Sequence, residues 1–351
     1  MRQNYSRLRN KISVAAKGIL GSALLVTQLV CLSSIAFGQS VSSTSSDLIK
    51  DQAQFRRPSS VMNTSDLSAK ALAGRLLFND VTLSASGTMA CASCHYQEKA
   101  WRDGQRKPLD RFGNPLLRHV PTLLNLSWAP LLSWDGRMGS LEQQALDPIT
   151  NARMGALSLD TARSRVEQRL THDTAFSMTY RQAFGDTTVT SDRIASAIAS
   201  FERSLVSTTA PFDRWIDGDD AAISLSAKKG FALFTGAARC SSCHSGWRLT
   251  DDSFHDVGLP DDDLGRGALF PSEPTLQHAF KTPTLRNVAV IGPYMHDGSL
   301  PTLEQVLVHY EEGFSRRASL DPDIKPLTLA PSDRADLLAF LETLTSPEPA
   351  P

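Results

Sequence analysis

The chain has 351 residues, of which 36 are Lys or Arg and 37 are Asp or Glu, so its formal net charge is −1. This even balance, without a run of basic residues, excludes a protein that binds nucleic acid through a basic face. The length and a hydrophobic content of 41% suit two modest globular domains.

Residues 1–38 have the pattern of a secretory signal peptide. They contain five basic residues and no acidic one, and an apolar run over 19–37 ends in small residues. The alternative is an uncleaved membrane anchor, but Ser, Thr and Gln side chains inside the run disfavour a stable span. We therefore expect an exported, periplasmic protein with no stable membrane insertion after cleavage.

Cleavage of this segment would remove five basic groups and leave a mature net charge of −6. The Ser- and Thr-rich sequence that follows predicts a flexible leader over 39–64. Residues 347–351 are expected to form a short tail.

Two Cys-x-x-Cys-His motifs, at 91–95 and 240–244, indicate c-type haem. Two thiols at this spacing can each bond one haem vinyl group, and the next residue places an imidazole under the iron. A disulfide and a zinc site are alternatives, but neither requires a histidine after the second cysteine. We predict two covalently bound haems c with His95 and His244 as proximal iron ligands. The attachment residues are Cys91, Cys94, Cys240 and Cys243.

An internal duplication accounts for two haems in one chain. Segment 121–143 aligns without a gap on 283–305, and nine of the 23 positions are identical at an offset of 162. The two haem motifs are offset by 149, so the intervening loops differ in length. Each half therefore has a haem motif, a variable loop, a Pro-Thr-Leu segment, an Asp-Gly turn and a helix.

The sequence between these landmarks is typical of helices. Residues 192–205 and 332–345 place apolar side chains on one helical face, with Asp192 and Ser332 as the expected caps. Residues 209–221 contain Pro, Gly and several Asp, as in an inter-domain stretch. The predicted fold is mainly α, with two cytochrome c-like haem domains related by duplication. Their predicted bounds are 65–210 and 211–346.

The far side of each iron determines the function. An electron carrier has two strong protein ligands on each iron, whereas a peroxide enzyme leaves one position open. The helix after the Asp-Gly turn carries Gln144 and Pro148 in the first half, and Val306 and Tyr310 at the equivalent positions of the second. Proline cannot coordinate iron, so the first haem would be open beside Gln144. Tyr310 can coordinate the second iron as a phenolate.

Segments outside the haem motifs also have a recognisable sequence, at 74–78, 121–125, 134–137, 141–145, 201–205, 211–214 and 293–298. With these segments and the two haem motifs, the chain resembles the dihaem cytochrome c peroxidases, and within them the MauG-like proteins, over about residues 65–346. The ordinary peroxidases have a methionine where this chain has Tyr310, and MauG-like proteins have a tyrosine. The resemblance also implies that Trp134 lies between the haems and that Gln144 is catalytic.

The resemblance implies that hydrogen peroxide binds at the His95 haem, where Gln144 orients it for O–O cleavage. The second oxidising equivalent would pass through Trp134 to the haem held by His244 and Tyr310. MauG-like members oxidise side chains of an exported protein partner. Ordinary peroxidases detoxify peroxide with electrons from a small redox protein, a cytochrome c or a cupredoxin. A dihaem electron-transfer protein without catalysis is a third possibility.

Departures from the family pattern concern the acid–base group and calcium. Arg153 stands where the family has an acid–base glutamate, and arginine cannot accept a proton. A calcium ion between the haems would use the backbone carbonyls of Ile291 and Pro293 and the side chain of His119, which replaces the family asparagine. Histidine is a poor calcium ligand, and His119 is the more readily interpreted as a structural residue. Met295 is expected to be a turn residue, not an iron ligand.

Overall fold

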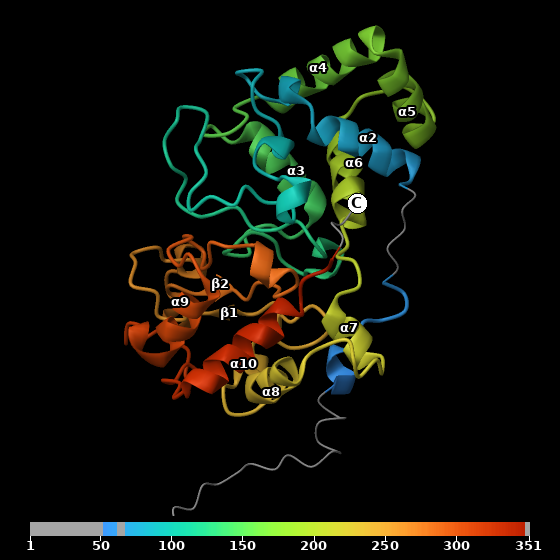
Figure 1. Cartoon of the computed structure of the whole chain (residues 1–351). Helices are drawn as coiled ribbons and strands as arrows, with labels where there is room; N and C mark the ends of the chain where they lie inside the picture. The colour runs from blue at the N-terminus through green and yellow to red at the C-terminus, as the bar shows by residue number, and fades with distance from the viewer. Residues whose placement is uncertain (1–51, 62–66, 348–351) are drawn as a thin grey trace, which may run out of the picture. The chain divides into compact units, whose positions relative to one another are not determined.

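The computed structural model describes residues 52–61 and 67–347 (Figure 1). The predicted signal peptide, most of the predicted leader and residues 348–351 lie outside these ranges. The mainly α fold is confirmed, since the extended structure assigned to the described chain is one small antiparallel sheet of β1 (Phe254–His255) and β2 (Phe280–Lys281). Within the described ranges, helices long and apolar enough to cross a membrane are absent.

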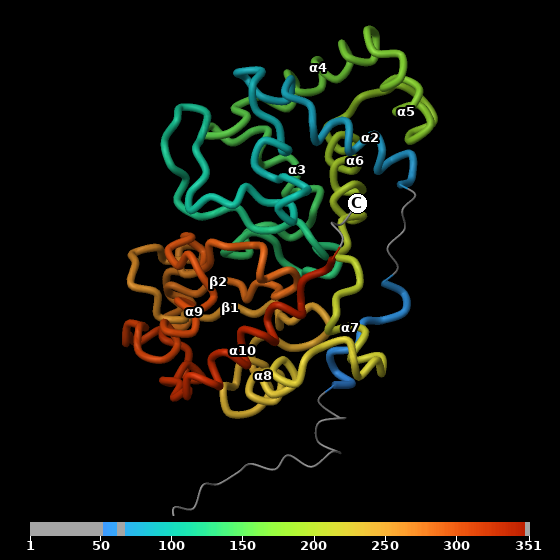
Figure 2. Tube along the Cα trace, viewed as in Figure 1, coloured from blue at the N-terminus to red at the C-terminus, as the bar shows by residue number. Residues whose placement is uncertain are grey.

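The helices of the first half pack around one core, against which Cys91 and Ala92 of the first haem motif lie. Figure 2 follows the chain from this half into the second. The first half contains α2 (Ala69–Phe78), α3 (Leu141–Thr150), α4 (Leu159–His172), α5 (Thr174–Phe184) and α6 (Ser191–Ser204). The second half contains α7 (Pro211–Ile216), α8 (Leu225–Thr235), α9 (Leu303–Val308), a π-helical turn (His309–Gly313) and α10 (Pro331–Glu342).

The duplication seen in the sequence is repeated in the backbone. The 3-10 turns Leu126–Trp128 and Val288–Val290 each follow an asparagine with φ of 62° or 61°. Gly74 of α2 faces α6 so closely that an added Cβ would lie 1.9 Å from the Ala197 carbonyl oxygen. Gly230 of α8 faces α10 in the same way, 1.9 Å from the Asp336 carbonyl oxygen. The same glycine-dependent helix crossing therefore supports both halves.

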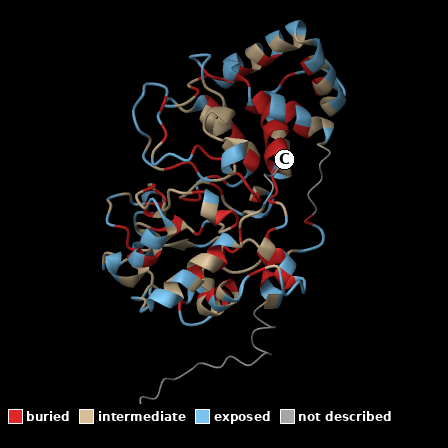
Figure 3. Cartoon of the chain, viewed as in Figure 1, coloured by how far each residue is buried: buried red, intermediate tan, exposed pale blue. Residues whose placement is uncertain are grey.

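Each half has its own hydrophobic core (Figure 3). The first core includes Phe78, Tyr180 and Phe201, and the second includes Phe231 and Phe340. Side chains of the first core extend to Leu205, and those of the second resume at Phe212.

Part of the predicted flexible leader is packed. Phe55 is fully buried in the second core, with its ring 5.5 Å from that of Phe231. Arg56 and Arg57 donate to the carbonyls of Ile216 and Ser207. The prediction of a flexible leader is wrong for residues 52–57, because a buried aromatic ring fixes this segment.

The two amphipathic helices also start elsewhere than predicted. The buried face of α6 is as expected, but its cap is Thr190, whose side chain accepts from the Arg193 amide, instead of Asp192. Helix α10 begins at Pro331, and Asp333 accepts from the Ala330 amide, so Ser332 lies inside the helix. Proline is favoured at the first position of a helix, so α10 begins at Pro331, one residue before the predicted start.

Candidate functional site

One cavity of about 690 Å³ is lined by residues of both haem motifs. Cys94 and His95 line it from the first half, and Cys240, Cys243 and His244 line it from the second. Cys91 is not part of this lining and packs against the first core. The cavity thus brings together most of the residues predicted to hold the cofactors.

The two histidines predicted as proximal iron ligands each use Nδ1 for a hydrogen bond to a backbone carbonyl. His95 Nδ1 donates to the Trp101 carbonyl at 2.7 Å, and His244 Nδ1 to the Leu249 carbonyl at 3.0 Å. Burial lowers the pKa of His95 to about 4 and also lowers the pKa of His244. Both rings are therefore neutral, and each Nε2 keeps a lone pair for iron.

The four motif cysteines are half-buried, and none of them is joined to another in a disulfide. Burial raises the pKa of Cys91 and Cys240 to about 12 and that of Cys94 to about 11. Cys91, Cys94 and Cys240 are thus thiols and not thiolates, and a thiol is the form that adds to a haem vinyl group. Together with the two imidazoles, these donors fit two haems c.

Helix α3 carries the residues that the sequence predicts on the far side of the first haem, and Gln144, Asp147 and Pro148 line the cavity. Ser140 caps it by accepting from the Gln143 amide, and Gln144 and Pro148 then share one face one turn apart. Gln144 Oε1 is buried without a hydrogen-bond partner in the described part of the chain. An unpaired buried acceptor costs about 1–3 kcal/mol. A ligand in the cavity that donates a hydrogen bond to Gln144 Oε1 would remove this cost. Asp147 also lines the cavity from this helix.

The equivalent segment of the second half changes its winding. Helix α9 ends at Val308, and Tyr310 lies in the π-helical turn that follows. Such turns are frequent at functional sites. Tyr310 lines the cavity with His244, and burial, with the nearby Cys240 and Cys243 thiols, raises the pKa of its phenol.

Trp134 is held by both halves of the chain. Its indole Nε1 donates to the His119 carbonyl at 2.9 Å, and its own carbonyl accepts from the Lys281 amide at 2.8 Å. Its ring centroid lies 5.9 Å from that of His119. This is consistent with the position between the haem sites that the sequence predicts for it.

The Arg153 side chain is bonded to the loop that contains Asp110 and Pro115. Its Nε donates to Asp110 at 2.8 Å and its Nη2 to the Pro115 carbonyl at 2.9 Å, while its own carbonyl accepts from the Arg111 amide. The side chain thereby ties the loop before residue 118 to the end of α3. The nearest carboxylate on the Gln144 face of α3 is instead Asp147.

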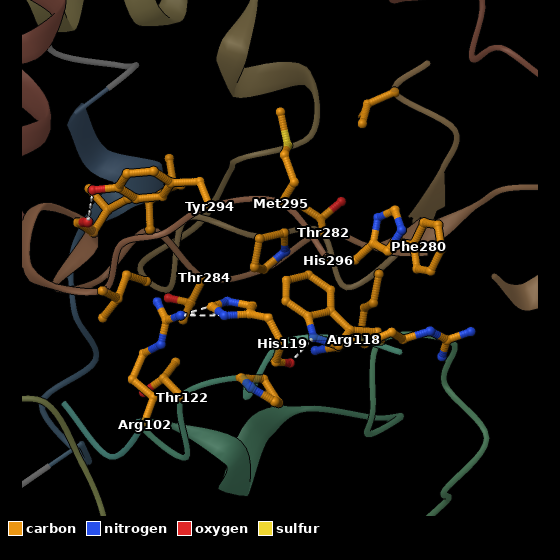
Figure 4. A pocket seen from close by; sticks show the side chains of 18 of the residues that line it. Arg102, Arg118, His119, Thr122, Phe280, Thr282, Thr284, Tyr294, Met295 and His296 are labelled. Carbon is orange, nitrogen blue, oxygen red and sulfur yellow. Dashed lines mark hydrogen bonds between the residues drawn. The ribbon is translucent and has the colours of Figure 1, made fainter. Parts of the chain in front are cut away.

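The donors predicted for calcium do not fit a divalent cation. The Arg102 guanidinium lies 3.3 Å from the Pro293 carbonyl and 2.6 Å from the ring nitrogens of His119 (Figure 4). A bound calcium ion would compete with this positive charge for the same oxygen. Ser133 and Met295 occupy equivalent left-handed turn positions, with φ of 71° and 68°, which agrees with the turn expected at Met295.

Sequence reasoning missed Arg102, Asp147 and a histidine of the second half. His255 bonds to Asp321 at 2.6 Å and to Asp251 at 2.8 Å, and it lies close to Cys243. Asp147 could have been found from its place on the Gln144 face. The other two have no sequence signal, since their partners lie in distant loops.

The comparisons with known proteins agree with this geometry. A family model described as di-haem cytochrome c peroxidase matches residues 68–221. The methylamine utilization protein MauG of Methylophilus methylotrophus is 47% identical over 297 residues, covering 83% of this chain and 88% of the relative. MauG of Methylorubrum extorquens is 46% identical over 310 residues, covering 87% and 86%.

More distant relatives include the cytochrome c551 peroxidase of Nitrosomonas europaea, 32% identical over 282 residues, covering 79% of this chain and 80% of the relative. A solved MauG-like protein associated with microbial copper homeostasis has a TM-score of 0.73 at 29% identity, covering 83% of this chain and 93% of its own. Fold and site thus define a dihaem c-type enzyme of the peroxidase class. The chain belongs to the dihaem cytochrome c peroxidase and MauG family.

Proposed function

We propose that this enzyme is a MauG-like dihaem oxidase of the periplasm, which reacts with hydrogen peroxide at the His95 site and oxidises an exported protein partner. The observation that carries the proposal is the asymmetry of equivalent positions, Pro148 in α3 and Tyr310 after α9. The similarity to two proteins named MauG supports it, at 47% and 46% identity.

When bound, the haems would supply redox-active iron, held by His95 at the first site and by His244 at the second. Gln144 lies on the helix face toward this site, and its side-chain amide can donate to one peroxide oxygen and accept from the other. That contact would orient the O–O bond and satisfy the buried Oε1.

Asp147 is the group that we assign to proton transfer. Arg153 is tied to Asp110 and has no free acceptor, whereas Asp147 is a carboxylate on the same helix face as Gln144. Its side chain is 27% exposed, so it can exchange protons with solvent. It would take the first proton from peroxide and return it to the departing oxygen.

Tyr310 would distinguish the second site from that of an ordinary peroxidase. Burial raises the pKa of its phenol, so loss of the proton requires a cation at bonding distance. Iron is such a cation, and an anionic axial ligand lowers the reduction potential of haem. Trp134, held by His119 and Lys281, would carry charge between the two sites.

The second candidate is an ordinary peroxidase that takes electrons from a small cytochrome c or cupredoxin. It is favoured by relatives such as the cytochrome c551 peroxidase, at 32% identity. An electron carrier without catalysis is disfavoured because Pro148 offers no ligand atom.

Stopped-flow absorbance and Mössbauer spectroscopy of the fully oxidised protein with one equivalent of peroxide separate these functions. We expect a rapid, long-lived change at both irons, which Tyr310→Met abolishes and the control Tyr180→Phe, in α5, retains. A response only after pre-reduction of one haem would instead establish the ordinary peroxidase. Inertness in both redox states would leave the electron carrier.

A further inference from the structure

A buried arginine lies where the two halves meet. Arg102 is 2% exposed, and its carbonyl accepts from the Tyr96 amide in the loop after the first haem motif. Its guanidinium contacts His119 of the first half at 2.6 Å and the Pro293 carbonyl of the second half at 3.3 Å (Figure 4). One side chain therefore bonds to both halves.

The electrostatics keep this group charged and its partner neutral. Burial lowers the pKa of Arg102 to about 10, still far above neutral pH. Burial and the adjacent Arg102 charge lower the pKa of His119 to about 3. The histidine ring thus accepts a hydrogen bond from a fixed cation.

His119 links this cation to the predicted route between the haem sites. The His119 amide donates to the His296 carbonyl at 2.9 Å, and the His119 carbonyl accepts from Trp134 Nε1 at 2.9 Å. Arg102 thus holds a residue that in turn holds Trp134. Loss of the guanidinium would therefore make the position of Trp134 less well defined, although Arg102 acts on Trp134 only through His119.

We propose that the Arg102 guanidinium is the built-in cation of the junction between the halves, standing in place of calcium and positioning His119 and, through it, Trp134. The protein is then independent of calcium. A divalent ion at the same carbonyl would meet a positive charge at contact distance, which is strongly unfavourable in a buried site. This inference goes beyond the proposed function and holds for any redox role of the two haems.

The first experiment uses the unaltered holoprotein. Metal content per iron is measured by mass spectrometry, and thermal unfolding and haem spectra are recorded before and after chelator treatment. We expect substoichiometric calcium and no change with chelator. One calcium per two irons, with a lowered unfolding temperature once it is removed, would overturn the proposal.

Substitutions then test the position itself. Arg102→Leu should lower the reduction potentials of the haems, because a buried positive charge is lost, and added calcium should not restore them. Arg102→Lys keeps the charge and should shift the potentials less. The control is Arg106→Leu, whose side chain is 66% exposed and lies in the same loop. Equal potentials in all four proteins would refute the positioning role.

A double variant tests whether a calcium site can be built at the position of the guanidinium. Arg102→Ser with His119→Asn removes the guanidinium and supplies two oxygen donors beside the Pro293 carbonyl. We expect it to bind calcium and to unfold at a higher temperature when calcium is present. A variant indifferent to calcium would contradict the claim that the guanidinium occupies a cation position. None of these measurements involves peroxide, so their outcome is independent of the proposed function.

Discussion

The two halves of this molecule share a backbone plan and differ in what faces each haem site. Both have the haem motif, the left-handed Asn, the Asp-Gly turn and the glycine-dependent helix crossing. Helix α3 continues regularly through Pro148, whereas α9 gives way to a π-helical turn that contains Tyr310. The backbone plan is thus common to both halves, and a change in one helical turn separates Pro148, which has no ligand atom, from Tyr310, which has one.

The largest effect is expected from placing a ligand over the open site. Pro148→His should bind the first iron through its imidazole, so peroxide reactivity is lost almost completely and a low-spin signal appears in electron paramagnetic resonance. Pro148→Ala, which has no ligand atom, should retain the reaction. A reactive Pro148→His protein would show that α3 does not cover the first haem.

Gln144→Ala should slow the reaction with peroxide by about 100- to 1000-fold, because a positioned donor is removed from the reacting oxygen. The rate constant from stopped-flow measurement at several peroxide concentrations gives the loss. The control Gln182→Ala, in α5 and exposed, should react at the normal rate. An unchanged rate in Gln144→Ala would remove this residue from the mechanism.

A comparison of Asp147→Asn with Arg153→Ala distinguishes proton transfer from structure. Asp147→Asn should lower the rate by about 100-fold, since the carboxylate is lost. Arg153→Ala should leave the chemistry intact but lower the unfolding temperature, because Asp110 Oδ2 loses the Arg153 Nε donor. A normal rate in Asp147→Asn with a slowed reaction in Arg153→Ala would assign proton transfer to the Arg153 segment instead.

The smallest effects on catalysis should come from the helix crossings. Gly74→Ala and Gly230→Ala each force a Cβ against a backbone oxygen and should destabilise the protein by about 1–3 kcal/mol in denaturant unfolding. Peroxide reactivity at low temperature should stay normal in both. A large loss for only one variant would show that the two crossings are not equivalent.

The parts of the candidate site that the sequence could predict depend on local spacing. Motif spacing predicted the proximal histidines, and the offset of 162 predicted the contrast between Pro148 and Tyr310. It could not predict that Arg102 meets a carbonyl 191 residues away, or that Arg153 pairs with Asp110, because loop contacts have no periodicity. Phe55 was missed for the same reason, since a single aromatic in a polar stretch has no pattern.

Phe55 precedes the first half in the sequence but packs in the core of the second half. The segment that precedes the first half completes the core of the second half, so this core lacks one aromatic ring until Phe55 packs into it. A fragment beginning near residue 211 would have a vacancy of one phenylalanine, a loss of about 3–5 kcal/mol by analogy with Phe→Ala changes. Residues 52–57 therefore couple the stability of the second half to the segment that leads into the first half.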